Sequence, residues 1–157
     1  MPGDLTLSNG GTDVVFDVLT LAGCFLAKTA WQQNLVLFFA DGQRIERGSS
    51  GFDLSDLPWT TDWPAEKEFF VQLIDTASGR HGWDRLRYDP PRAAEYLATY
   101  RAMLAGFTPV ATGATPGRPD WRIAPRDALL ARCARHDLYQ GEQGCRLCDH
   151  WIQPIEQ

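Results

Sequence analysis

The sequence predicts an α+β fold, with an N-terminal antiparallel sheet packed by two helices and a small zinc-stabilised C-terminal module. Three observations lead to this prediction. The first third of the chain alternates apolar and polar residues around turn signals, as strands do. The middle third repeats apolar residues at the spacing of amphipathic helices. The last third joins a linker rich in proline and glycine to clustered cysteine and histidine.

The chain has 157 residues, of which 44% are hydrophobic and 22% charged, as in an ordinary globular protein. This length allows one domain with a hydrophobic core and a small appendage. We expect an α+β body over residues 1–107, a linker over 108–120 and a zinc-binding tail over 121–157. The linker has almost no large apolar side chains, so it cannot bury much surface.

The predicted sheet begins near the N-terminus. Asn9-Gly10-Gly11 is a turn signal, and Val14, Phe16 and Val18 then alternate with other residues as the inward positions of a strand do. This pattern predicts a hairpin whose second strand carries the three alternating side chains.

A second hairpin is predicted further along. The apolar run 35–39 is followed by Asp41-Gly42, a strong hairpin signal, and then by a short strand at 44–46. The segment between the two hairpins, 19–31, fits a buried strand and a short helix equally well, because a short apolar run has no diagnostic period.

Two helices are predicted in the middle third. Pro64 suits the first turn of one helix, which Gly79 ends. The second helix begins after Asp89, which suits the N-cap position, and stops at Gly106. Their apolar stripes are Phe69, Phe70, Leu73, Ile74 and Ala77 in the first helix and Tyr96, Leu97, Tyr100, Met103 and Leu104 in the second.

The tail contains two pairs of metal-ligating residues. Cys133 and His136 are separated by two residues, as are Cys145 and Cys148. This spacing lets a tight turn direct both side chains of a pair at one point, as a tetrahedral zinc site requires. We expect these four residues to bind one structural zinc ion, with His150 as the alternative to His136. Disulfides are disfavoured in a reducing cytoplasm.

Neighbouring residues fit this interpretation. Gly144 directly precedes the second pair and suits a turn with positive φ. Arg132, Arg135 and Arg146 are expected to offset the negative charge of the zinc shell or to donate hydrogen bonds to its sulfurs. A catalytic zinc is not expected, because four protein donors leave no open position for water.

The two ligand pairs resemble the small zinc-ribbon and zinc-knuckle modules, in which two knuckles clamp one zinc between short strands. The resemblance reaches from Cys133 to Trp151 at most. It implies a metal and a local fold, and it implies no function, since such modules serve many roles.

Few other residues are candidates for chemistry. The sequence has no phosphate-binding or dinucleotide-binding glycine motif. Cys24 lies in an apolar segment and is interpreted as a buried small hydrophobe. His81 follows the first predicted helix and is a candidate base, although no matching nucleophile is evident.

The formal charge of −5 lies wholly within residues 1–106, and the remainder is neutral overall. An acidic body disfavours broad nucleic-acid binding and favours a basic protein partner. Acidic and aromatic residues alternate over 52–68, which suggests either a docking surface or a solvated loop. The residues concerned are Asp53, Asp56, Asp62, Glu66 and Glu68, interleaved with Phe52, Leu54, Leu57, Trp59 and Trp63.

We therefore expect a non-enzymatic protein that binds another protein, as an adaptor or an inhibitor of the immunity type. The preference for arginine over lysine is typical of a GC-rich bacterial genome. The alternatives are a nucleic-acid-associated zinc regulator, which the tail arginines favour, and a hydrolase-like enzyme with a site near His81. Neither a secretory signal nor a membrane-spanning segment is evident, so we expect a cytoplasmic location.

Overall fold

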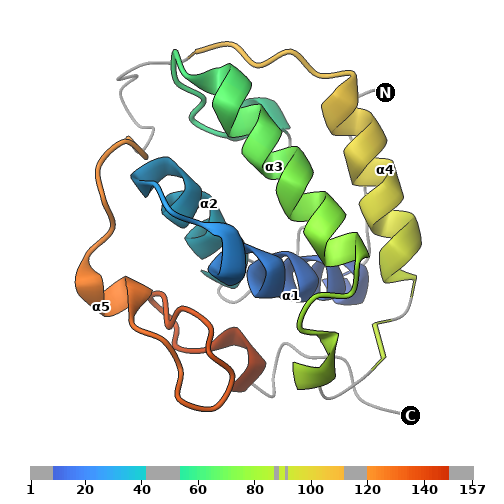
Figure 1. Ribbon diagram of the computed structural model, residues 1–157, viewed down its shortest axis with the longest axis vertical. Coiled ribbons are helices and arrows are strands. Elements are labelled where there is room, and N and C mark those ends of the chain that lie inside the picture. Colours follow the sequence, from blue (N-terminus) through green and yellow to red (C-terminus); the bar gives the residue numbers. More distant parts are fainter. Residues whose placement is uncertain (1–8, 42–53, 87–88, 91, 112–119, 149–157) are drawn as a thin grey trace.

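The computed structural model describes residues 9–41, 54–86, 89–90, 92–111 and 120–148, and these are mainly helical. Four helices form the body (Figure 1). They are α1 (Asn9–Leu26), α2 (Ala30–Asp41), α3 (Trp63–Ser78) and α4 (Ala93–Ala105). Short segments complete the fold, namely α5 (Asp127–Leu130) and the 3-10 helices η1 (Leu54–Asp56), η2 (Trp83–Arg85) and η3 (Arg146–Cys148).

The predicted antiparallel sheet is wrong, because the described residues contain no strand, only an isolated bridge near the C-terminus. The segment 9–11 opens α1, and Val14, Phe16 and Val18 lie within it. The alternation was misleading because the residue between two of these positions, Val15, is buried as well. A helix buried on all sides shows no polar face, so its sequence looks like that of a buried strand.

The second predicted hairpin is wrong in its first strand. The apolar run 35–39 lies in α2, which ends at Asp41. Residues 44–46, the predicted partner strand, lie outside the described residues. The ambiguous segment 19–31 holds the end of α1 and the beginning of α2, so its helical interpretation is the correct one.

The two helices predicted in the middle third are confirmed. Pro64 lies in the first turn of α3, and Gly79 is its C-cap. Gly106 is the C-cap of α4. The predicted N-cap of α4, Asp89, is wrong, because Arg92 occupies that position with φ of 57°.

The helices enclose one hydrophobic core. Helix α1 contacts α2, α3 and α4, and α3 and α4 lie side by side (Figure 1). Fully buried side chains such as Leu21, Phe39, Phe70 and Leu97 come from all four helices. In the described residues, no helix has both the length and the apolar character needed to cross a membrane.

The C-terminal segment 120–148 packs on the body and shares this core (Figure 1). Trp121 lies 5.4 Å from Trp31 of α2, measured between ring centroids. Leu138, Tyr139 and Leu147 are buried in the same cluster as the side chains of α1 and α2. Packing against the body therefore supplies the hydrophobic core that so short a segment lacks.

Candidate metal centre

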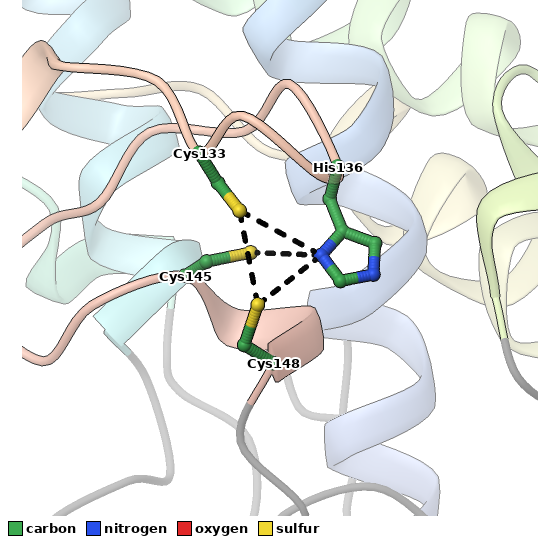
Figure 2. Close-up of side chains that lie close together, drawn as sticks. All are labelled: Cys133, His136, Cys145 and Cys148. Carbon is green, nitrogen blue, oxygen red and sulfur yellow. Dashed lines mark hydrogen bonds between the residues drawn. The ribbon is translucent and has the colours of Figure 1, made fainter.

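Cys133, His136, Cys145 and Cys148 converge on one point (Figure 2). The Nδ1 atom of His136 lies 3.8 Å from the sulfur of Cys133 and 3.4 Å from the sulfurs of Cys145 and Cys148. The sulfurs of Cys133 and Cys148 are 3.7 Å apart. All four ligand atoms lie within 4.8 Å of one another.

These separations fit a tetrahedral metal ion. With metal–sulfur bonds of about 2.3 Å and a metal–nitrogen bond of about 2.0 Å, the ligand atoms of a tetrahedron lie about 3.5–3.8 Å apart. A disulfide would need a sulfur–sulfur distance of about 2.05 Å, and the cysteines are free. The cluster of three cysteines and one histidine is therefore arranged to hold a metal ion.

The first ligand pair lies on a tight turn held by backbone hydrogen bonds. The Cys133 amide donates to the carbonyl of Leu138, and the Asp137 amide donates to the carbonyl of Cys133, both at 2.8 Å. The Arg135 amide donates to the sulfur of Cys133 at 3.4 Å. Asp137 reverses the chain just after His136, with φ of 58°. These hydrogen bonds hold the backbone of the turn that carries both side chains.

In the second ligand pair, Cys145 directly precedes η3 and Cys148 is its last residue. The Cys148 amide donates to the carbonyl of Cys145 at 3.2 Å, which closes the turn between the two ligands. The predicted positive φ before this pair is confirmed, since Gly144 has φ of 83°. The loop that precedes it is tied to α2, because the carboxylate of Asp41 accepts hydrogen bonds from the amides of Glu142 and Gln143.

The electrostatic setting of His136 suits a metal ligand. Burial lowers its pKa, and the positive charges of Arg135 and Arg85 lower it further. The imidazole is therefore held neutral, with a lone pair available for a metal.

The thiols are in mixed surroundings. Burial raises the pKa of Cys145 to about 12 and also raises that of Cys148. For Cys133 burial acts in the same direction, but hydrogen bonds from the amides of Arg135 and His136 and from the other two thiols together outweigh it, and its pKa is lowered. Three thiolates this close together repel one another unless a cation lies between them, so a metal would stabilise the charged cluster.

Of the three arginines predicted near the sulfurs, Arg135 donates its backbone amide to Cys133, whereas Arg132 and Arg146 have other contacts. Arg146 is fully buried and reaches into the helical body, where its guanidinium pairs with the carboxylate of Asp17. Arg132 donates to the carbonyls of Cys24 and Asp137, at 2.6 and 3.0 Å. These two arginines thus join the segment 120–148 to α1 and α2.

The role of Asp17 was not predicted from the sequence. The available signal was a lone carboxylate between Phe16 and Val18 in the most apolar part of the chain. A charged group there must be paired when the segment is buried. Its partner, 129 residues away in the sequence, could not be identified from spacing.

The alternative ligand His150 lies outside the described residues, as do Phe52 and Asp53. The aromatic side chain at the centre of the acidic stretch points inward, since Trp59 is 1% exposed and stacks on Trp31. Glu66 is also buried and accepts hydrogen bonds from the amide and hydroxyl of Thr60. Trp59 therefore contributes to the core, and Trp63 packs against it.

His81 lines a cavity of about 340 Å³ beside the cysteine–histidine cluster, together with Cys24. Cys24 is not an activated nucleophile. Burial raises its pKa to about 11, and its sulfur accepts a hydrogen bond from the Tyr139 amide at 3.4 Å. The His81 ring stacks on Phe25, with centroids 4.3 Å apart.

Comparison of the chain with protein-family models, with curated proteins and with solved structures gives no match. The fold and site therefore define the class on their own: a helical protein that carries a cluster of three cysteines and one histidine able to hold a metal ion.

Proposed function

We propose that Cys133, His136, Cys145 and Cys148 bind one zinc ion with a structural role, in a non-enzymatic protein that acts by binding another protein. The observation that carries the zinc proposal is the spacing of the four ligand atoms, all within 4.8 Å. Thiolates with an imidazole are a ligand set that zinc prefers, and four protein donors close its coordination shell.

The positions of the proposed ligands support a structural role. The segment 120–148 has little regular secondary structure of its own, since α5 has only four residues. A metal at this site would join the turn at Cys133–His136 to η3, and the two would then be held together by metal–ligand bonds. The free energy of metal binding would thus contribute to the folding of this segment.

Metal analysis of purified variants tests the zinc proposal. We expect one zinc per chain in the wild type and loss of zinc in Cys145→Ser. The His136→Ala variant should lose most of its metal, whereas His150→Ala should keep it. Equal zinc in the wild type and Cys145→Ser would contradict the site. Loss of zinc in His150→Ala but not in His136→Ala would identify His150 as the fourth ligand.

The support for a basic protein partner is the charge of the body. The chain has a formal charge of −5, and two exposed carboxylates lie on α3, Glu68 and Asp75, of which Asp75 pairs with Arg101 of α4. With Val71, Gln72 and Thr76 they line a shallow depression of about 460 Å³. Opposite charge on a partner would speed its encounter with this face.

The tail arginines give the nucleic-acid alternative little support. Arg122 pairs with Asp120 and Arg126 pairs with Glu142, at 2.9 and 2.8 Å. Arg132 lies 3.6 Å from the carboxylate of Asp137. Cations already paired with carboxylates have less charge to offer a phosphate backbone.

Capture experiments with matched charge changes test the protein-binding proposal. The Glu68→Lys variant changes the charge of the α3 face, and Glu95→Lys makes the same change on α4. We expect the wild type and Glu95→Lys to retain a partner that Glu68→Lys loses. The purified partner should then bind more weakly as salt increases. Equal retention by both variants, or a salt-independent affinity, would contradict this face as the docking surface.

A further inference from the structure

The cavity beside the metal centre is built from four separate parts of the chain. Cys24 and Phe25 come from the end of α1, His81 from the turn after α3, and Arg85 from η2. Arg132 and Asp137 come from the C-terminal segment and complete the lining. Its volume of about 340 Å³ lies within the range of small-molecule sites, about 300–1,000 Å³.

The lining is positive although the whole chain is acidic. Arg85 and Arg132 bring two guanidinium groups to the cavity, and Asp137 brings one carboxylate. His81 adds an imidazole whose ring can donate a hydrogen bond. Guanidinium groups present planar pairs of donors, which match the oxygens of phosphate and carboxylate groups.

Arg132 is held in place by its surroundings. Its two terminal nitrogens donate to the carbonyls of Cys24 and Asp137, and its guanidinium lies 5.1 Å from the centre of the Tyr139 ring. These contacts use two of its five N–H donors, so further donors remain for a ligand. A donor group that is already fixed loses little conformational entropy on binding.

Arg85 is less engaged. Its only hydrogen bond within the described residues goes to the carbonyl of His136, at a long 3.5 Å. The guanidinium can therefore turn towards a ligand at small cost. Asp137 opposes anion binding. Its carboxylate lies 3.6 Å from Arg132, so it would repel an anion bound to that guanidinium.

We propose that this cavity binds a small anion that carries a phosphate or carboxylate group, held by Arg85 and Arg132. Phe25 is 64% exposed and stacks on His81, so the two rings form a wall on one side of the anion. The proposal rests on the cavity and its charges, and it is independent of which metal the neighbouring cluster binds.

Calorimetric titration of the metal-loaded full chain tests this site, with inorganic phosphate and malonate as the two probes. The Arg85→Gln variant removes the less engaged guanidinium. Arg101→Gln is the matched control, because it makes the same charge change on α4, where Arg101 pairs with Asp75 outside the cavity. Asp137→Asn removes the repelling charge, and asparagine tolerates the positive φ of that position.

We expect saturable binding of at least one probe to the wild type. Arg85→Gln should weaken it by at least about tenfold, as expected for a charge-assisted hydrogen bond. Arg101→Gln should leave it unchanged, and Asp137→Asn should tighten it. Binding of phosphate alone or malonate alone would identify the anionic group of the ligand.

Two results would overturn the proposal. One is the absence of saturable binding of both probes to the wild type. The other is equal weakening in Arg85→Gln and Arg101→Gln, which would indicate non-specific attraction to positive charge. Metal content and thermal unfolding of each variant show whether it is folded, and Asp137→Asn tests the site by a gain of affinity that misfolding cannot produce.

Discussion

Arg146 donates from Nε to the carboxylate of Asp17, and neither side chain has any surface exposed to solvent. The guanidinium also donates to the carbonyl of Phe39 at 3.2 Å and lies 5.6 Å from the centre of the Phe16 ring. Arg146 is the first residue of η3; Cys145 directly precedes it and Cys148 ends the helix. The same short turn therefore holds half of the metal centre and anchors it to α1 and α2.

Replacement of Arg146 by methionine should strongly destabilise the protein, because it leaves Asp17 charged and buried. Breaking one side of a buried ion pair costs about 3–5 kcal/mol. Urea unfolding of metal-loaded protein measures the change. In Asp17→Asn/Arg146→Met the loss should be smaller than the sum of the single losses.

A surface ion pair provides the control for this prediction. Arg101 and Asp75 are about half exposed, with side-chain accessibilities of 48% and 50%. Arg101→Gln should cost at most about 1 kcal/mol. If Arg146→Met costs no more than this, the buried pair does not anchor η3.

Removal of the metal should loosen the C-terminal segment before the rest of the protein. Hydrogen exchange monitored by mass spectrometry, with and without a chelator, measures this. We expect the amides of Cys133 and Asp137, which close the first ligand turn, to lose protection first. Helices α3 and α4 should keep theirs, because they pack mainly on each other and on α1. Equal loss of protection throughout the chain would contradict a local structural role.

Cys24 should make stability depend on pH in the alkaline range. Burial raises its pKa from 9.0 to about 11, so the folded state holds this proton more tightly than the unfolded state. The resulting stabilisation is fully present below pH 9 and is lost as the pH rises through about 11. A shift of this size corresponds to roughly 2–3 kcal/mol.

The difference in unfolding free energy between the wild type and Cys24→Ala isolates this effect, since other titrating groups are common to both. We expect the advantage of the wild type to decrease between pH 9 and 11 in metal-loaded protein. A difference that stays constant over this range would show that the thiol does not titrate with a raised pKa.

The features that depend on neighbouring residues could be predicted from the sequence, whereas contacts between distant residues could not. Helix boundaries are marked by proline and glycine because their backbone preferences do not depend on the rest of the fold. The bounds of α3 and the end of α4 were therefore predicted, from Pro64, Gly79 and Gly106. The cluster of three cysteines and one histidine was predicted because two-residue spacing is itself a local geometric feature.

The N-terminal helices could not be recognised in the same way. Val15 and Val18 of α1 and Leu35 of α2 are each at most 1% exposed, so no polar stripe marks the helical period. β-Branched and aromatic residues there favoured a strand assignment, which tertiary packing overrides. The cavity and the Asp17–Arg146 pair join residues far apart in sequence, and only the folded chain brings them together.

Gly23 is required where α1 crosses α2. A Cβ atom at this position would overlap Cγ2 of Val36 and lie 3.1 Å from its Cγ1. Valine cannot turn away easily, because its branched side chain has one preferred rotamer in a helix. Although alanine is the better helix former, Gly23→Ala should therefore destabilise the protein by about 1–3 kcal/mol, as measured by urea unfolding.

A second variant separates this steric effect from helix propensity. Val36→Ala removes the overlapping methyl groups, so Gly23→Ala/Val36→Ala should lose less stability than the sum of its single changes. Gly106→Ala is the control, because its Cβ would meet nothing closer than 3.8 Å and its φ is −87°. We expect it to change stability by at most about 0.5 kcal/mol. Equal effects of Gly23→Ala and Gly106→Ala would mean that α1 and α2 can move apart without cost.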